Sequence, residues 1–82
     1  MASPYASQHQ RAIKYLEEAE LKLSQKIYDR AIYYANMSLN YGDYAESYLF
    51  RGIALFRSQD YHKAKKDLDL AITKLDTLFS QG

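Results

Sequence analysis

One pattern of small and aromatic residues occurs twice in this chain, at an offset of 33 positions. The recurring residues are alanine or glycine, tyrosine, and leucine or isoleucine. The first copy comprises Ala12, Tyr15, Leu16, Ala19, Tyr28, Ala31 and Leu39, and the second comprises Ala45, Tyr48, Leu49, Gly52, Tyr61, Ala64 and Ile72. Repeats with a period of about 20 to 50 residues are typical of stacked units that bury a core only against their neighbours. The repeat therefore predicts two copies of one unit packed on each other.

The apolar residues of each copy recur at steps of three and four, which is the periodicity of amphipathic helices. No segment alternates between apolar and polar residues at every second position, as a half-buried strand would. The pattern therefore predicts an all-α fold of two stacked antiparallel helical hairpins, with an extended C-terminal helix. The predicted helices span residues 7–24, 28–41, 44–57 and 61–80.

Residues that start and stop helices stand at the ends of these segments. Ser7 and Gln10 have the spacing of a capping box at the start of the first helix. Gly42 follows the second helix, where a stop in the left-handed conformation is favoured. Asp43 is then a candidate N-cap for the third helix.

The length of 82 residues allows one small domain with a thin core. We expect a flexible lead-in over residues 1–6 and a single domain over residues 7–80. Within that domain we expect repeat one at about 12–44, repeat two at about 45–76 and a helix extension at 77–80.

Charge and residue usage exclude several classes of protein. The net charge of +1 creates no field that would attract nucleic acid or a membrane. The chain has no cysteine, which excludes disulfides and thiolate metal sites. No apolar run is long enough to span a bilayer, and the first residues lack the regions of a secretory signal peptide. We expect a cytoplasmic location, with a nuclear one also open.

The motifs of catalysis are missing from the sequence. There is no glycine-rich phosphate loop and no recognisable nucleophile motif. His9 and His62 are far apart, and neither has a second histidine at metal-ligand spacing. The sequence therefore predicts a protein that is not an enzyme and that has no catalytic residue, cofactor or metal site.

The second copy resembles the signature of the tetratricopeptide repeat, a helix–turn–helix unit of about 34 residues. Its matching residues are Tyr48 at the large aromatic position, Gly52 at the glycine, Leu55 at the next bulky position, Ala64 at the alanine and Leu68 at the large residue that follows. The first copy matches with Tyr15, Ala19 and Ala31, and it has Lys22 and Ala35 where larger groups are usual. The resemblance covers about residues 10–76 and implies a right-handed α-solenoid.

The two copies also depart from the family pattern. Glu18 and Arg51 are equivalent residues at a position where the pattern has leucine. We hypothesise that they form an ion pair between neighbouring helices; two independently solvated charges are the alternative. Asp43 and Asp76 replace the proline of the pattern, so the last helix need not stop at residue 76.

The resemblance implies a protein-binding groove, because the first helix of each hairpin lines the concave face in this family. The groove residues would be Ile13, Leu16, Glu20, Leu23, Glu46, Leu49, Ile53, Phe56 and Arg57. A mostly apolar row of this kind suits a hydrophobic helix or extended segment of another protein. The predicted function is protein–protein interaction, as an adaptor or co-chaperone-like module. For Ile13 and Leu23 a place in the core is an equally open interpretation.

The extended last helix supports an alternative function. Leu75, Leu78 and Phe79 would form an apolar overhang that folds back, pairs with a second copy or docks on another protein. We favour self-pairing, so the alternative is a structural subunit that forms a homodimer. A distant third class, nucleic-acid binding, depends on Lys63, Lys65 and Lys66, whose field the neighbouring aspartates largely cancel.

Overall fold

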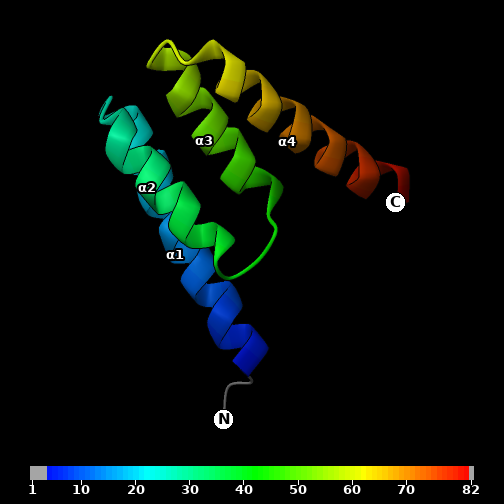
Figure 1. Ribbon diagram of the computed structural model, residues 1–82. Coiled ribbons are helices and arrows are strands. Elements are labelled where there is room, and N and C mark those ends of the chain that lie inside the picture. Colours follow the sequence, from blue (N-terminus) through cyan, green and yellow to red (C-terminus); the bar gives the residue numbers. More distant parts are fainter. Residues whose placement is uncertain (1–3, 82) are drawn as a thin grey trace.

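The computed structural model describes the backbone of residues 4–81 and the side chains of residues 7–80. Over this range the chain forms four helices and no strand, so the predicted all-α class is confirmed (Figure 1). The helices are α1 (Pro4–Ser24), α2 (Tyr28–Leu39), α3 (Ala45–Arg57) and α4 (Tyr61–Gln81). None of these helices combines the length and the apolar character that crossing a bilayer requires.

The helices form two hairpins, which we call the first hairpin (α1 and α2) and the second hairpin (α3 and α4). Figure 1 shows that the chain reverses direction between the two helices of each hairpin. Besides its partner α4, α3 packs against α2 and also contacts α1. One side of the first hairpin is thus covered by α3. Among the described residues no helix lies on the corresponding side of the second hairpin.

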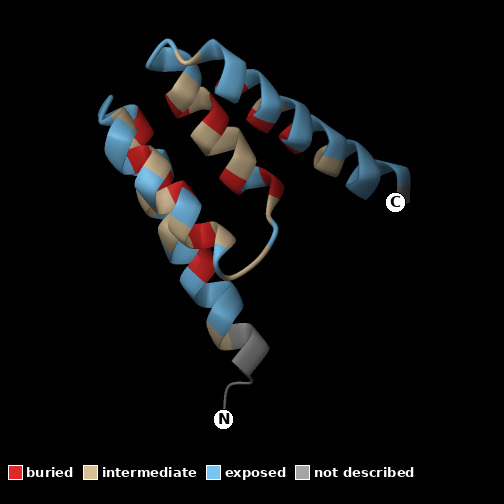
Figure 2. Cartoon of the chain, in the orientation of Figure 1, coloured by how far each residue is buried: buried red, intermediate tan, exposed pale blue. Residues whose placement is uncertain are grey.

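Small side chains dominate the buried positions. Seven alanines with at most 1% exposure lie on α1, α2, α3 and α4, on the sides that face other helices (Figure 2). These alanines are Ala12, Ala19, Ala31, Ala35, Ala54, Ala64 and Ala71. Small residues bring helix backbones close together, which gives the dense packing of a protein interior without large side chains. The recurrence of alanine and glycine in the sequence therefore marks the helix contacts.

One core cluster joins three helices. Leu23 of α1, Ala31 of α2 and Ala54 of α3 form its centre, and Tyr28, Ile32, Phe50 and Ile53 pack against it. The cluster lies at the junction of the first hairpin with α3, so it holds the two hairpins together.

The turn inside each hairpin contains a residue in the left-handed conformation that is not glycine. These residues are Lys26, with φ of 63°, and Gln59, with φ of 70°, which are 33 positions apart. In each turn the next N–H donates to the carbonyl five residues earlier, at 2.9 Å: Ile27 to Lys22 and Asp60 to Leu55. This is the hydrogen bond of a Schellman motif. The two hairpins therefore share one turn geometry.

The predicted helix ends at Gly42 and Asp43 were wrong. Gly42 does not have a positive φ. Its missing side chain instead makes room for the ring of Tyr44, which a Cβ atom would overlap. The helix α3 begins after Tyr44, whose side chain makes no capping hydrogen bond. A larger residue at position 42 would therefore have to displace the tip of the Tyr44 side chain.

The first and last helices are longer than their partners. α1 and α4 each have 21 residues, whereas α2 has 12 and α3 has 13. α1 begins at Pro4, inside the range 1–6 that was predicted as a flexible lead-in, so Ser7 lies within the helix and does not cap it. Residues 1–3 of that range lie outside the described residues. α4 continues to Gln81, and Figure 1 shows its last turns leading away from α3.

Candidate functional site

The structure buries two of the residues predicted to line a groove. Leu16 and Leu23 of α1 are 6% and 7% exposed, so neither can contact a partner as predicted. The physical reason is the contact between α1 and α3, which places Ala54 against Leu23 in the core cluster. For Leu23 the alternative interpretation, a core position, is the one observed.

The remaining predicted residues lie at or near the surface. Ile53 is half-buried because it packs against the core cluster, and Leu49 is half-buried as well. The others are exposed: Ile13, Glu20, Glu46, Phe56 and Arg57. Phe56 is the large apolar residue of this set that is most exposed, at 55%.

Phe56 borders a hollow between α3 and α4. Its ring meets the ring of Tyr61 edge to face, with the ring centroids 5.3 Å apart. The hollow has a volume of about 350 Å³ and is lined by Phe56, Tyr61, Ala64, Lys65, Leu68 and Asp69. Four of these six side chains are apolar or aromatic, so the hollow suits an apolar group with charges at its rim.

An apolar stripe continues from this hollow along α4. Tyr61, Leu68, Ile72 and Phe79 are separated by seven, four and seven residues, a spacing that places them on one face of a helix. Ile72 is 60% exposed and Phe79 is 81% exposed. Together with Phe56, these four residues form a surface that we call the open face.

The sequence prediction missed most of the part of the open face that lies on α4, and it placed Phe79 in an apolar overhang for self-association instead. It assigned the groove to α1 and α3 only, whereas Tyr61, Leu68 and Ile72 lie on α4. The offset of 33 was the available signal, because Tyr61 and Ile72 repeat Tyr28 and Leu39. In the structure Tyr28 and Leu39 are half-buried in the first hairpin. Equivalent positions differ in exposure because α3 covers only the first hairpin.

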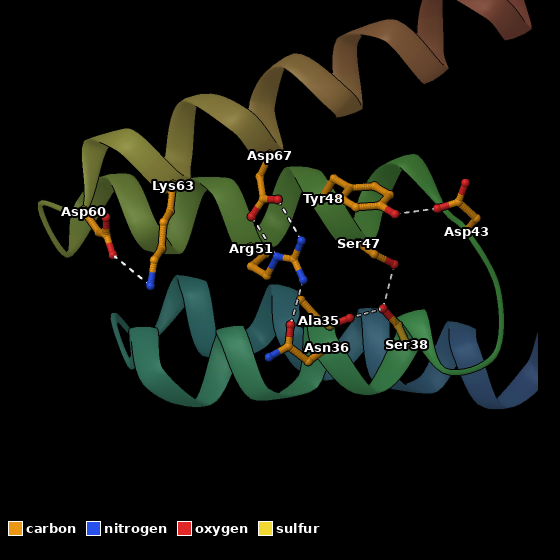
Figure 3. Close-up of polar contacts among 10 residues, drawn as sticks. All are labelled: Ala35, Asn36, Ser38, Asp43, Ser47, Tyr48, Arg51, Asp60, Lys63 and Asp67. Atoms are coloured by element: carbon orange, nitrogen blue, oxygen red, sulfur yellow. Dashed lines mark hydrogen bonds and ion pairs between the residues drawn. The ribbon is translucent and has the colours of Figure 1, made fainter.

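An ion pair links the two helices of the second hairpin on the side that faces α2. The guanidinium of Arg51 donates from Nε and Nη2 to the two carboxylate oxygens of Asp67, at 2.7 Å each (Figure 3). Its Nη1 donates to Asn36 of α2 at 2.9 Å. The bond to Asp67 raises the pKa of Arg51 above its ordinary value. The hypothesised pair between Glu18 and Arg51 was wrong, because Asp67 and Asn36 bind the guanidinium.

The repeated tyrosine has different neighbours in the two hairpins. The ring of Tyr15 stacks on Tyr34 and Tyr41, at centroid distances of 6.3 and 5.8 Å. Its equivalent Tyr48 lies under two cations instead, Arg51 at 5.5 Å and Lys74 at 5.6 Å from the ring centroid. Both arrangements stabilise an aromatic ring, one by stacking and one by cation–π attraction.

Tyr48 and Lys74 also meet at Asp43. The hydroxyl of Tyr48 donates to Oδ1 of Asp43 at 2.5 Å (Figure 3), and Lys74 donates to Oδ2. These bonds, first the one from Lys74, lower the pKa of Asp43. The bond to Asp43 raises the pKa of Tyr48. Asp43 therefore connects the loop before α3 to both α3 and α4, in place of the capping role predicted for it.

A second cleft opens where α4 diverges from the start of α3. It has a volume of about 580 Å³ and is lined by Asp43, Tyr44, Ala45, Glu46, Thr73, Lys74, Thr77 and Leu78. Of the three residues predicted as an apolar overhang, Leu78 lines this cleft, Leu75 is half-buried and Phe79 is exposed. The overhang is thus divided between the cleft and the open face.

Two of the three lysines in the predicted patch, Lys63 and Lys65, lie beside carboxylates of their own hairpin. Lys65 donates to Asp69 at 2.7 Å, which raises the pKa of Lys65. Lys63 lies 3.9 Å from Asp60. These contacts reduce the positive field that a phosphate backbone would need.

Comparisons of the chain with protein-family models, with curated proteins and with solved structures found no match.

Proposed function

We propose that this protein is a protein–protein interaction module with the architecture of two tetratricopeptide-like repeats. The shared turn at Lys26 and Gln59 supports the repeat, since equivalent residues take the same unusual conformation. The packing order supports it too, because α3 contacts both helices of the first hairpin. The module is an adaptor, which acts by binding another protein.

The exposure of the open face is the observation that carries this proposal. Phe56 is 55% exposed, whereas its equivalent in the first hairpin, Leu23, is 7% exposed. Several exposed large apolar side chains on one face of a well-packed scaffold favour a site of protein interaction, because leaving them in water is unfavourable. Binding a partner protein removes that cost.

Site-specific photo-cross-linking tests the proposal. A benzophenone amino acid at position 56 should give discrete adducts with a partner protein in the cells that make this chain. The same group at Leu21, an exposed apolar residue on α1, is the matched control and should not. Phe56→Glu should lower co-purification of the captured protein by about tenfold. Equal labelling from both positions would contradict the proposal.

Self-association through the last helix is a second candidate, favoured by the exposure of Leu78 and Phe79. Sedimentation equilibrium over a wide concentration range distinguishes the two functions. A monomer has a mass of 9.6 kDa and a homodimer has twice that mass. Leu78→Glu combined with Phe79→Glu should return a dimer to the monomer mass.

A further inference from the structure

The hollow on the second hairpin corresponds to a place on the first hairpin that α3 fills. Shifted back by 33 positions, its lining residues correspond to positions on α1 and α2. Those counterparts are Leu23, Tyr28, Ala31, Ile32, Ala35 and Asn36. Four of them, Leu23, Tyr28, Ala31 and Ile32, belong to the core cluster that α3 completes. The first hairpin therefore shows how a helix fills this place.

α3 fills the counterpart with apolar and small side chains. Ala54 joins Leu23 and Ala31 at the centre of the cluster, and Phe50 packs against it. Two polar bonds between α3 and α2 accompany this packing. Nη1 of Arg51 donates to the side-chain oxygen of Asn36, and the hydroxyls of Ser47 and Ser38 are bonded at 2.6 Å. A helix on the equivalent surface thus needs small and aromatic residues along one side and a basic residue beside them.

We propose that the open face of the second hairpin binds an amphipathic helix of a partner protein, which lies as α3 lies on the first hairpin. The helix places a small and an aromatic residue in the hollow beside Phe56 and an arginine against Asp69. This inference rests on the proposed function as an interaction module, and it names the kind of partner.

The charge at the rim specifies the arginine. Asp69 is the equivalent of Asn36, so a carboxylate replaces the amide oxygen that accepts from Arg51. The side chain of Asp69 is 59% exposed and binds Lys65 through Oδ2. A guanidinium pairs with a carboxylate more strongly than with an amide, and docking excludes water from the pair. Lys65 binds Oδ2, so Oδ1 of Asp69 is the rim atom that can accept from a basic residue on the incoming helix.

A second copy of this chain does not supply a suitable helix by head-to-tail stacking. In such a stack α1 of the next molecule would take the place that α3 has on the first hairpin. Its residues Lys14, Glu17 and Glu18 stand where α3 has Ser47, Phe50 and Arg51. These side chains would bury charge in the hollow and set Glu18 against the carboxylate at the rim, which is unfavourable.

The continuous helix of α4 shows that no turn at the position equivalent to the one after α2 brings a further helix onto the open face. In the first hairpin the chain leaves α2 and turns through residues 40–44 to reach α3. The equivalent residues, 73–77, are part of α4. The short turn that delivers α3 to the first hairpin is therefore not made on the second.

A peptide of residues 43–59, which contains α3, is the probe for this binding. Labelled with fluorescein, it is titrated with the full chain and followed by fluorescence anisotropy. We expect saturable binding that Ile72→Glu weakens by about tenfold or more, because it places a charge on the open face. Leu21→Glu on α1 is the matched control and should bind as the unaltered chain does. Circular dichroism verifies that each variant is folded.

A charge exchange tests the arginine. The peptide with Arg51→Glu should bind the unaltered chain about tenfold more weakly, and Asp69→Arg in the chain should restore that loss. A general effect of charge would restore binding equally with Asp29→Arg, an exposed position on α2, whereas a specific pair requires the change at position 69.

Three outcomes would overturn the proposal. The first is no binding at millimolar peptide. The second is binding that Ile72→Glu does not change, which would arise if the peptide displaced α3 on the first hairpin. The third is a homodimer that Ile72→Glu dissociates, which would make a second copy the occupant. Cross-linking of a partner at position 56 together with any of these would keep the proposed function and reject the helix.

Discussion

Arg51 binds Asp67 through two hydrogen bonds of 2.7 Å, and the side chain of Asp67 is only 7% exposed. The same guanidinium donates to Asn36, so one side chain of α3 is bonded to both α4 and α2. A bidentate pair of this kind fixes the distance between helices and also their rotation. The positions equivalent to Arg51 and Asp67 in the first hairpin are occupied by Glu18 and Tyr34.

Removing Arg51 alone should strongly destabilise the fold. Arg51→Leu leaves the buried carboxylate of Asp67 without its partner, so we expect the free energy of unfolding to fall by about 3 kcal/mol or more. Urea denaturation followed by circular dichroism measures the change. The double variant Arg51→Leu with Asp67→Leu removes both charges and should be more stable than Arg51→Leu. Strict additivity of the two changes would disprove the coupling.

Two buried serines join the hairpins and predict unequal effects of substitution. The hydroxyl of Ser38 donates to the carbonyl of Ala35 at 2.6 Å, so Ser47 is the donor in the 2.6 Å contact between Ser47 and Ser38 (Figure 3). Ser38→Ala leaves the Ser47 hydroxyl buried without an acceptor and should cost about 1–3 kcal/mol. Ser47→Ala leaves Ser38 bonded to Ala35 and should cost less.

Thermal or urea unfolding of the two single variants and of the double variant measures this asymmetry. The double variant Ser38→Ala with Ser47→Ala removes both hydroxyls, and we expect it to be more stable than Ser38→Ala alone. Equal losses from the two single variants would show that Ser47 is not the donor to Ser38.

The effect of Gly52→Ala on stability should change sign with the size of the side chain at position 68. A Cβ atom at position 52 would lie 2.9 Å from Cγ and Cδ2 of Leu68 and 3.2 Å from Cβ of Asp67. Gly52→Ala should therefore destabilise the unaltered chain by about 1 kcal/mol, since overpacking outweighs the gain in helix propensity.

In the Leu68→Ala background the overlap with Cγ and Cδ2 of residue 68 is gone, and only the 3.2 Å approach to Cβ of Asp67 remains. The helix propensity of alanine should then stabilise the chain by a few tenths of a kcal/mol. Urea denaturation of the four chains gives both differences. A loss of the same size in both backgrounds would mean that Leu68 does not determine the need for glycine.

The bond from Tyr48 to Asp43 predicts a pH dependence at both ends of the scale. The raised pKa of Tyr48 stabilises the fold below about pH 10, and this contribution is lost as the pH rises through the pKa of the folded state. The lowered pKa of Asp43 stabilises the fold above about pH 4, and this contribution is lost as the pH falls through the pKa of the folded state.

Tyrosinate absorbance measures the alkaline part directly. Asp43→Asn should lower the pKa of Tyr48 toward its ordinary value. Tyr48→Phe should remove the tyrosine whose ionisation is shifted to higher pH. Tyr33→Phe is the control. It removes a tyrosine that lies under Arg30 and leaves the bond between Tyr48 and Asp43 in place. An unchanged titration in Asp43→Asn would rule out this origin of the shift.

The existence of the four helices, and the bounds of the two inner ones to within two residues, followed from the sequence because they depend on local information. The spacing of apolar residues predicted α2 to within two residues at its end and α3 to within one at its start. Gly42 shows where a local rule failed. Glycine favours a left-handed stop, but Gly42 does not have a positive φ, and the ring of Tyr44 lies where its Cβ atom would be. The left-handed residues are Lys26 and Gln59, whose types give no such signal.

The tertiary structure alone decided which of two equivalent residues is buried and which partner a charged residue binds. Leu23 and Phe56 occupy the same position in the repeat, and they differ in exposure because α3 covers one hairpin and leaves the other open. Arg51 and Glu18 are equivalent in sequence, but equivalence does not determine distance, and Asp67 on the paired helix is the nearer acid. The offset of 33 determined the repeated unit, whereas the packing of α3 on the first hairpin determined which of two equivalent faces is covered, because burial depends on what packs beside a residue.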